Sequence, residues 1–517
     1  MPWIRDARPR RRELLAAGGA LVLGAVLGDR DGFPRLLATA PAFVRDRPLV
    51  THGVQTGDPT HEGGVVWARA DRPSRMWVEL GADTRVPGPV VGPAGDHTGK
   101  VVLRGLPSGT EVPFRVVFEA LHAPGAVSEP VAGSLRTAPA DERGVSFLWS
   151  GDLAGQGWGI NPDAGGFRIF RAMAAVGGDF FLCSGDTVYA DIPLAPAVTL
   201  PDGRTWTNLV TPAKAKVAET LDEYRGQYAY NLQDAALQAF AARVPQVNQW
   251  DDHEVANGWY TGEVLEDPRR TEQRVDVLAE RAREAFFEWL PTHPHARRWR
   301  TVHRKISHGP LLDVFVVDMR TYRDPNGGDR YADPRRGLLG PAQRAWLERE
   351  LAASTATWKV LANDLPIGLV VPDGPGPDAV AQGIGGRPLG RELEFAEILR
   401  RAHRDGVTGI VMLTADVHYA AAHHYDPARG SAGEFTPFWE FVTGPLNAGP
   451  GQPRALDPTF GPEVVFQSAA PPPGACPLDG YQYFGEVAID GSSRVMTVRL
   501  RDIDGAVLYS VDLPPGG

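Results

Sequence analysis

Acidic and histidine side chains follow several strand-like segments of this sequence, each at the point where the segment ends. The densest group is Asp251-Asp252-His253-Glu254, which directly follows an apolar run from Val244 to Trp250. Three carboxylates and an imidazole in a row are costly to bury unless a positive partner lies among them, and a metal ion is the simplest such partner. The stretch therefore predicts a metal site.

Other apolar segments end in the same way. Three of them lead into carboxylate, phenol or imidazole side chains: Asp152 after 145–150, Asp186 and Tyr189 after 180–184, and Asp416 and His418 after 409–414. Loops that follow strands lie together at the carboxyl edge of a sheet in an open α/β fold, so we expect these side chains to meet at the edge of one sheet. For any one motif the alternative is an Asp that caps a helix or begins a turn. Four motifs together favour a shared metal site.

Oxygen and imidazole ligands at strand ends suit hydrolysis assisted by Lewis-acid cations. Two cations about 3.5–4 Å apart can hold the attacking and the leaving oxygen of a hydrolytic displacement. We expect Asp186 to bridge the cations. We expect His253 to protonate the departing alkoxide or to stabilise the charge on the equatorial oxygens of the transition state. Glu254 or Asp251 would then orient the His253 ring. The alternative for His253 is a neutral imidazole packed under Trp250, whose loss would change stability more than turnover.

Arginine side chains follow another buried segment, residues 311–318. A forked guanidinium matches phosphate or sulfate oxygens, so Arg320 is a candidate substrate clamp. A structural ion pair of Arg320 with Asp318 or Asp324 is the alternative. Asn363, which follows residues 358–362, is one more side chain that could bind a metal ion.

The size and charge of the chain set outer limits on its function. A length of 517 residues is too great for one core and predicts about two or three domains. The net charge of −10 argues against a nucleic-acid partner, because a phosphate backbone calls for an excess of Lys and Arg. An anionic substrate must therefore be held by local groups.

The first residues have the order of an export signal. Arg10-Arg11-Arg12 precedes apolar residues 16–27, which are too few to span a bilayer, and Ala40-Pro41-Ala42 fits a cleavage site. The Arg-Arg pair resembles a twin-arginine signal. We expect residues 1–42 to direct the protein through the twin-arginine export machinery to the periplasm or the exterior, with no integral membrane segment after cleavage.

The rest of the chain divides by its pattern into two predicted domains. Short apolar runs without helical periodicity predict a β-sandwich over 43–140, in which residues 106–110 resemble the turn of fibronectin type III modules. Residues 141–517 alternate strand-like and helix-like segments, as an α/β fold requires. This part has several expected elements: helices at 166–175, 221–242 and 275–290, loops at 257–273 and 371–388, strands of a second sheet at 438–442 and 486–489, and a hairpin at 495–508. Only two cysteines occur, Cys183 and Cys476, and their pairing is left open.

Taken in order, these motifs resemble the metallophosphoesterase superfamily and, within it, the PhoD-like alkaline phosphatases. The resemblance rests on Ser184 to Asp191, Trp250 to Glu254 and Ala415 to His418, and on His52 to Pro59 in the β domain. The Gly-Asp-x-x-Tyr element is also similar to that of purple acid phosphatases, in which the Asp bridges two metals and the Tyr binds iron.

The resemblance implies an architecture, an activity and a set of ligands. The fold would be a four-layer metallophosphoesterase-like β-sandwich flanked by helices, preceded by a fibronectin-like or Ig-like β-sandwich. The activity would be metal-dependent phosphate-ester hydrolysis that releases phosphate outside the cytoplasm, with two or more metal ions, calcium and/or iron. By motif position the metal ligands would be Asp152, Asp186, Tyr189, Asp252, Asp416 and His418, with Asn363 a weaker candidate. The alternatives are a phosphodiesterase of the same fold and, from another class, a non-catalytic exported binding protein.

The sequence departs from the PhoD pattern at one position. That pattern has a Ser-Cys pair in the first acidic loop, with the Cys a metal ligand, and Gly151-Asp152 stands in its place. A carboxylate instead of a thiolate favours oxygen-seeking ions, which argues against iron at that position.

Overall fold

The structure is a computed structural model that describes residues 47–326, 337–373, 376–471 and 475–516. Pro48–Gly517 forms one compact unit. The predicted export signal, residues 1–42, lies outside the described residues. Within the described ranges, no helix has the length and apolar character needed to cross a membrane.

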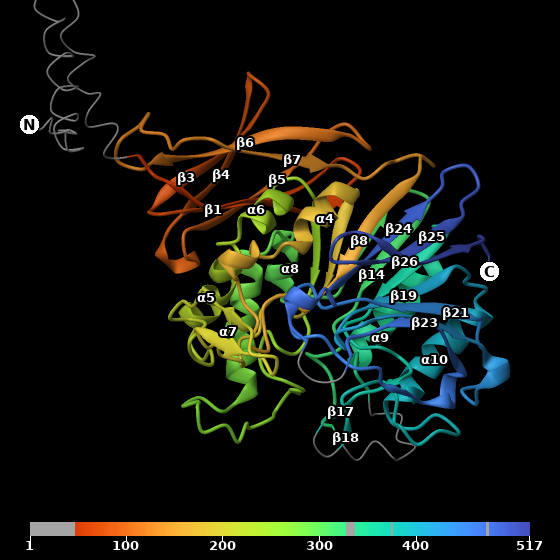
Figure 1. The fold of residues 1–517 in the computed structure, drawn as a ribbon. Helices are drawn as coiled ribbons and strands as arrows, with labels where there is room; N and C mark the ends of the chain where they lie inside the picture. Colours follow the sequence, from red (N-terminus) through yellow and green to blue (C-terminus); the bar gives the residue numbers. More distant parts are fainter. Residues whose placement is uncertain (1–46, 327–336, 374–375, 472–474, 517) are drawn as a thin grey trace, which may run out of the picture. The chain divides into compact units, whose positions relative to one another are not determined.

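Two large sheets lie at the centre of this unit (Figure 1). The nine-stranded sheet has the order β26-β25-β24-β8-β9-β12-β1-β2-β5, and the seven-stranded sheet has the order β13-β14-β15-β19-β21-β20-β23. In the second sheet, β13 spans Arg304–His308, β20 spans Ala420–Tyr425 and β23 spans Pro462–Ser468. The strands that carry the candidate site are β8 (Val145–Ser150), β9 (Phe180–Ser184), β12 (Gln246–Gln249), β14 (Leu312–Val316), β15 (Trp358–Ala362) and β19 (Ile410–Thr414). In the first sheet β8, β9 and β12 run parallel, and in the second β14, β15, β19 and β21 (Phe438–Val442) do so.

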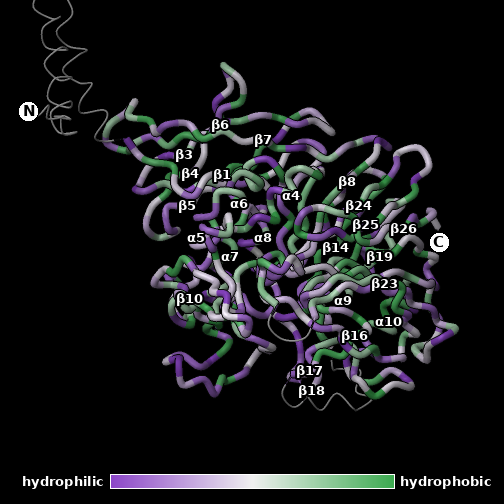
Figure 2. The backbone as a smooth tube through the Cα atoms, viewed as in Figure 1, coloured by the Kyte–Doolittle hydropathy of each residue, from purple (hydrophilic) through white to green (hydrophobic). Residues whose placement is uncertain are grey.

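Apolar side chains of the two sheets pack against each other in one buried cluster. Phe147 and Leu182 of the first sheet share it with Val360 and Leu413 of the second. Figure 2 shows hydrophobic stretches of the trace near β14 and β19. The strands are buried on both faces, because their alternate side chains point to a second cluster on the helix side of each sheet.

Helices cover the outer faces of both sheets. The nine-stranded sheet is covered by α4 (Ile169–Val176), α5 (Leu221–Asn231), α6 (Ala235–Ala241), α7 (Val275–Trp289) and α8 (Pro294–Trp299), and the seven-stranded sheet by α9 (Gly340–Ala353) and α10 (Arg391–Arg404). The result is the expected four-layer arrangement of helices, sheet, sheet and helices. The predicted helix over 221–242 is two helices, because Asp234 caps α6 by accepting a hydrogen bond from the Leu237 backbone N–H (2.9 Å).

Residues 50–136 form a β-sandwich, as the sequence predicts. Its four-stranded sheet has the order β4-β3-β6-β7 and faces β1, β2 and β5 across a common core. Its strands are β1 (Val50–Thr60), β2 (Gly63–Ala70), β3 (Ser74–Leu80), β4 (Thr84–Val91), β5 (Thr98–Leu103), β6 (Glu111–Ala120) and β7 (Val131–Arg136). β1 also pairs with β12 at Gly57 and Gln246, so this sandwich extends the nine-stranded sheet. The division at residue 140 and the fibronectin type III assignment stay predictions.

Two expectations about sheet membership are wrong. The acidic loops do not follow strands of one sheet, because β8, β9 and β12 belong to the first sheet and β15 and β19 to the second. The segments 438–442 and 486–489 do not share a sheet either, since β21 lies beside β19 and β24 (Tyr483–Ile489) beside β8. An apolar pattern predicts a strand, but it does not show which distant strand will pair with it.

The final hairpin, β25 (Met496–Asp502) and β26 (Val507–Leu513), is confirmed, and both cysteines are free and buried.

Candidate metal centre

The candidate ligands lie just beyond the carboxyl ends of the parallel strands of both sheets. Asp152 follows β8, Asp186 follows β9 and Asp416 follows β19, and all of them are buried except for a partly exposed Asp416. Asp152, Asp186, Asp416 and His418 have positive φ angles of 61°, 48°, 68° and 62°. Such angles are uncommon and unfavourable for residues other than glycine, and they concentrate at functional sites. Their gathering at the strand ends of the two sheets indicates a site.

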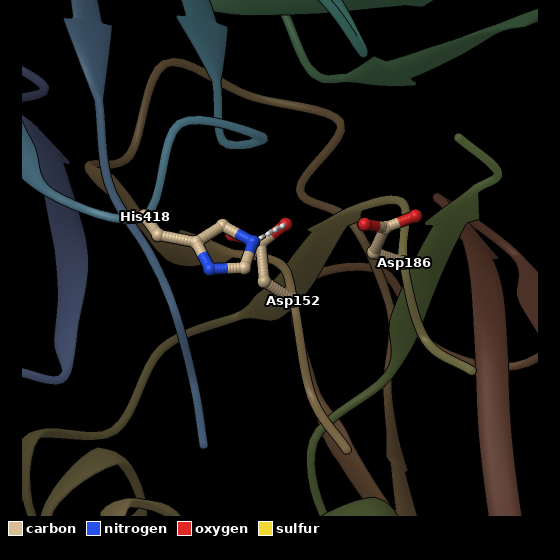
Figure 3. Close-up of side chains that lie close together, drawn as sticks. All are labelled: Asp152, Asp186 and His418. Atoms are coloured by element: carbon tan, nitrogen blue, oxygen red, sulfur yellow. Dashed lines mark ion pairs between the residues drawn. The ribbon is translucent and has the colours of Figure 1, made fainter. Parts of the chain in front are cut away.

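The first group of ligand atoms comes from Asp152, Asp186 and His418. One atom of each lies within 4.8 Å of the others, and the three side chains point toward one another (Figure 3). His418 Nε2 lies 3.7 Å from Asp152 Oδ1, yet neither oxygen of Asp152 has a hydrogen-bond partner. Burial raises the pKa of Asp152 and Asp186 well above the usual range, and neighbouring carboxylates add to that rise. Asp186 Oδ1 accepts a hydrogen bond from the His253 backbone N–H (3.1 Å), so Asp152 is the unpartnered carboxylate of this group, and its place beside Asp186 and an imidazole fits a cation that none of these side chains supplies.

The ring of His418 is held in the form that binds a metal ion. Its Nδ1 donates a hydrogen bond to the Gly449 carbonyl oxygen, so Nε2 carries the lone pair. Burial lowers the pKa of His418 to about 4, which keeps the ring neutral. Tyr189 Oη lies 2.9 Å from Nε2, so the predicted phenol ligand also reaches the first group.

The second group comes from Asp186, Asp252 and His253, again with one atom of each within 4.8 Å of the others. Asp186 is common to both groups, as a bridging ligand must be. Asp252 Oδ2 accepts a hydrogen bond from the Gly258 N–H (2.6 Å), so Oδ1 is the oxygen left for a cation. Asp416 lies nearby, because Arg320 Nη2 is 3.6 Å from Asp252 Oδ2 and 3.9 Å from Asp416 Oδ1.

Two further ligand candidates carry unpartnered buried oxygens. Asp416 Oδ2 and Asn363 Oδ1 both lack a hydrogen-bond partner. Asn363 Nδ2 contacts Met412 Sδ at 3.5 Å, which leaves its carbonyl oxygen as the free end of the amide. Asn363 stays a candidate on that basis.

His253 stands beside these ligands as a candidate proton donor. Its Nδ1 lies 2.9 and 3.0 Å from the two oxygens of Asp191, and its ring stacks on Tyr189 with centroids 4.4 Å apart. Burial lowers the pKa of His253, but the charges of Asp191, Asp252 and Asp186 outweigh burial and raise it well above its ordinary value. This balance of charges favours the protonated form of the ring.

The expected partner of the His253 ring was wrong. Asp191 orients the ring, while Glu254 accepts hydrogen bonds from the backbone N–H groups of Thr187 (2.7 Å), Asp186 (3.2 Å) and Asp251 (2.8 Å). Glu254 thus ties the loop after β12 to the loop after β9. The sequence shows Asp191 as the last residue of the motif that contains Asp186. Its contact with His253, however, depends on how two distant loops pack together.

Arg320 is not placed as a substrate clamp. Its side chain is fully buried, with Nε 2.5 Å from Asp251 Oδ1 and Nη1 3.0 and 2.8 Å from the two oxygens of Asp378. Arg320 forms its short ion pairs with Asp251 and Asp378, so the predicted partners Asp318 and Asp324 are wrong. Asp318 instead accepts from the Arg320 backbone N–H (3.2 Å). Asp378 lies in the segment 371–388, which we expected to be a loop, and its side chain is buried.

A four-layer β-sandwich with two groups of carboxylate and imidazole ligands at its strand ends defines a metal-binding phosphoesterase. The family model described as "PhoD-like phosphatase" matches residues 147–500, and "PhoD-like phosphatase, N-terminal domain" matches residues 37–139. The chain belongs to the PhoD-like phosphatase family, as its motifs indicated.

Individual proteins agree with this assignment. The curated relative alkaline phosphatase D of Bacillus subtilis (strain 168) is 27% identical over 472 residues, which cover 85% of this chain and 76% of the relative. A solved structure of PhoD matches with a TM-score of 0.65 and 20% identity, over 90% of this chain and 88% of the other. The purple acid phosphatase PPD1 of yellow lupin (Lupinus luteus) seeds matches with a TM-score of 0.56 and 12% identity, over 91% and 74%. These two structures support the α/β phosphoesterase fold.

Proposed function

We propose that this protein hydrolyses phosphate monoesters with two or more metal ions, which would be held at the carboxyl ends of the parallel strands of the two sheets. The observation that carries the proposal is the pair of buried ligand groups that share Asp186. Bound cations would supply Lewis acidity, which stabilises the charge that develops on phosphoryl oxygens. The shared carboxylate would keep the two positive charges next to each other.

The residues suggest how the ions would be held. Asp152, Asp186 and His418 would hold one ion, with Tyr189 beside them, and Asp186, Asp252, Asp416 and Asn363 would hold another. We propose calcium and/or iron as the metals. The oxygen-rich donor set suits calcium, whereas the phenol of Tyr189 supports iron, and Asp152 in the place of a thiolate moves the balance toward oxygen-seeking ions.

His253 would act as the general acid. Asp191 holds Nδ1, so the second N–H of the imidazolium, on Nε2, is directed toward Asp252 (3.9 Å from Nε2 to Oδ1) and the ligand groups. A departing alkoxide in this position would receive that proton, while Asp191 keeps the ring from rotating. The stacking of the ring on Tyr189 fixes its plane.

An ester panel combined with elemental analysis tests the activity. The purified protein should contain metal and hydrolyse p-nitrophenyl phosphate faster than bis(p-nitrophenyl) phosphate. Chelation should abolish turnover, and adding calcium or iron back should restore it. Full activity after complete chelation would refute the proposal. A preference for the bis-ester would identify a phosphodiesterase instead, and a metal-free protein inactive on both esters would favour the non-catalytic binding protein.

We further propose that the protein is exported by the twin-arginine route. The support is the order of Arg10-Arg11-Arg12, the apolar residues 16–27 and Ala40-Pro41-Ala42 in the sequence. Replacing Arg11 and Arg12 together by Lys should make the full-length precursor accumulate inside the cell. Unchanged export of that variant would exclude the twin-arginine route.

A further inference from the structure

We infer that Asp378 and Arg320 act as a positioning pair, which decides which carboxylate oxygens of Asp252 and Asp416 face the metal ions. The inference rests on the proposed function, because it concerns the same centre. It assigns a role to two buried residues that act through the candidate ligands.

The guanidinium of Arg320 is held from two sides. Nε lies 2.5 Å from Asp251 Oδ1, and Nη1 lies 3.0 and 2.8 Å from the two oxygens of Asp378. Asp378 Oδ1 also lies 2.5 Å from Arg323 Nη2. Charge-assisted contacts of this kind are short, directional and strong, so the plane of the Arg320 guanidinium is fixed.

The third nitrogen of Arg320 faces the metal centre. Nη2 is buried without a hydrogen-bond partner and lies 3.6 Å from Asp252 Oδ2 and 3.9 Å from Asp416 Oδ1. A purely structural ion pair would use all its donors, because a buried donor without a partner costs stability. The unused N–H groups of Nη2 are aimed at the two candidate ligands.

This arrangement leaves one oxygen of each carboxylate free. Asp252 Oδ2 is occupied by the Gly258 N–H and faces Arg320, so Oδ1 is left on the His253 side. Asp416 Oδ1 faces Arg320, and Asp416 Oδ2 has no partner. Arg320 therefore attracts Asp252 Oδ2 and Asp416 Oδ1, and the other oxygen of each carboxylate would be left to hold an ion. Supporting groups of this kind orient ligands at metal sites.

Asp378 is the part of the pair that can be changed with the smallest change of shape. Asp378→Asn removes the negative charge that holds Nη1 but keeps the size of the side chain. Arg320→Lys keeps the positive charge but loses the fork, so it cannot reach Asp251, Asp378 and the ligands together. Asp313→Asn is a matched control, because Asp313 is also a buried carboxylate. It lies on β14, the strand that precedes Arg320, and its Oδ2 lies 2.6 Å from Ser354 Oγ.

The test uses the full-length protein with its metals. We expect Asp378→Asn and Arg320→Lys each to lower the retention of metal against graded chelator by about 10- to 100-fold, the range found for residues that support ligands. We expect kcat on p-nitrophenyl phosphate to fall by a similar factor with KM unchanged, because the guanidinium is fully buried and held by Asp251 and Asp378, and so acts on the ligands. A substrate clamp would raise KM instead. Asp313→Asn should match the wild type in both measurements.

The outcomes separate this inference from the proposed function. Wild-type protein that retains metal and is active, with both variants folded by circular dichroism and equal to the control, would overturn the positioning role alone. A rise of KM with unchanged metal retention would also overturn it, in favour of a clamp. If Asp378→Asn fails to fold, Asp378→Glu takes its place. The longer side chain keeps the negative charge but displaces the Arg320 guanidinium, so the same result is expected. A wild type without metal and without activity would overturn the proposed function and this inference with it.

Discussion

The two candidate cation positions differ in how their negative charge is balanced. At the first, Asp152 is buried and neither of its oxygens has a hydrogen-bond partner. At the second, Asp252 Oδ2 accepts from a backbone N–H and lies 3.6 Å from Arg320 Nη2, and the imidazole of His253 lies on the side of Oδ1. The first position therefore depends on a bound cation for its charge balance, whereas the second shares the charge with groups that also have catalytic and positioning tasks.

The strongest test of this comparison is a substitution of Asp186, the residue that both positions share. Asp186→Asn removes the charge from both ligand groups, so we expect both metal ions to be lost. Since Lewis-acid stabilisation is worth several kcal/mol, turnover should fall by at least about 1000-fold. Elemental analysis and p-nitrophenyl phosphate hydrolysis measure the two effects. A variant that keeps a full complement of metal would show that Asp186 does not bridge.

The next effect belongs to the second position alone. His253→Asn removes the proposed proton donor, and we expect turnover of an alkyl phosphate to fall by about 100-fold, the lower part of the range for general acids. Hydrolysis of p-nitrophenyl phosphate should fall less, because its leaving group needs little protonation. The metal content should not change, and a loss of metal would instead make His253 a ligand. Equal losses on both esters would remove it as the acid.

The strand ends of this centre could be read from the sequence, because their signal is local. An apolar run that turns abruptly into Asp152, Asp186 or Asp416 needs no knowledge of distant residues. The apolar runs also gave the positions of most strands, and their alternation with amphipathic segments gave the layered α/β class. The resemblance to a family added the four-layer arrangement.

The partners across loops could not be read in the same way. Asp191 and Asp378 are acids in loops, and nothing near them in sequence shows that one meets His253 and the other Arg320. Such contacts depend on how the two sheets stack, because that packing brings loops together that are far apart in the sequence. The same cause explains why Arg320, read as an arginine at a sheet edge, is in fact enclosed by carboxylates.

A smaller effect separates the two positions by stability. In metal-free protein, Asp152→Asn replaces a buried carboxylate that has no partner, so we expect the variant to be more stable than the wild type by about 1–3 kcal/mol. With metal present the order should reverse, because the wild type gains the binding energy that the variant loses. Denaturant unfolding with and without chelator measures both.

Asp252→Asn is the matching change at the second position. Arg320 lies 3.6 Å from the Asp252 carboxylate, so the variant loses a favourable charge interaction even when no metal is bound. We therefore expect no gain of stability in the metal-free state. An equal gain for both variants would mean that Arg320 and His253 do not balance the charge of the second position.

The smallest expected effect comes from a glycine that touches the first position only. A Cβ at Gly444 would lie 2.2 Å from Asp152 Oδ2, too close for any real contact, so Gly444→Ala must displace that carboxylate. We expect the affinity of the first position for metal to fall by about 10-fold, the lower end of the range for supporting residues. Gly433→Ala is the control, because Gly433 also has a positive φ, +93°, but an added Cβ there meets nothing within 4 Å. Chelator titration of both variants should show a change for Gly444→Ala alone, since backbone strain is common to the two and the displaced carboxylate is not.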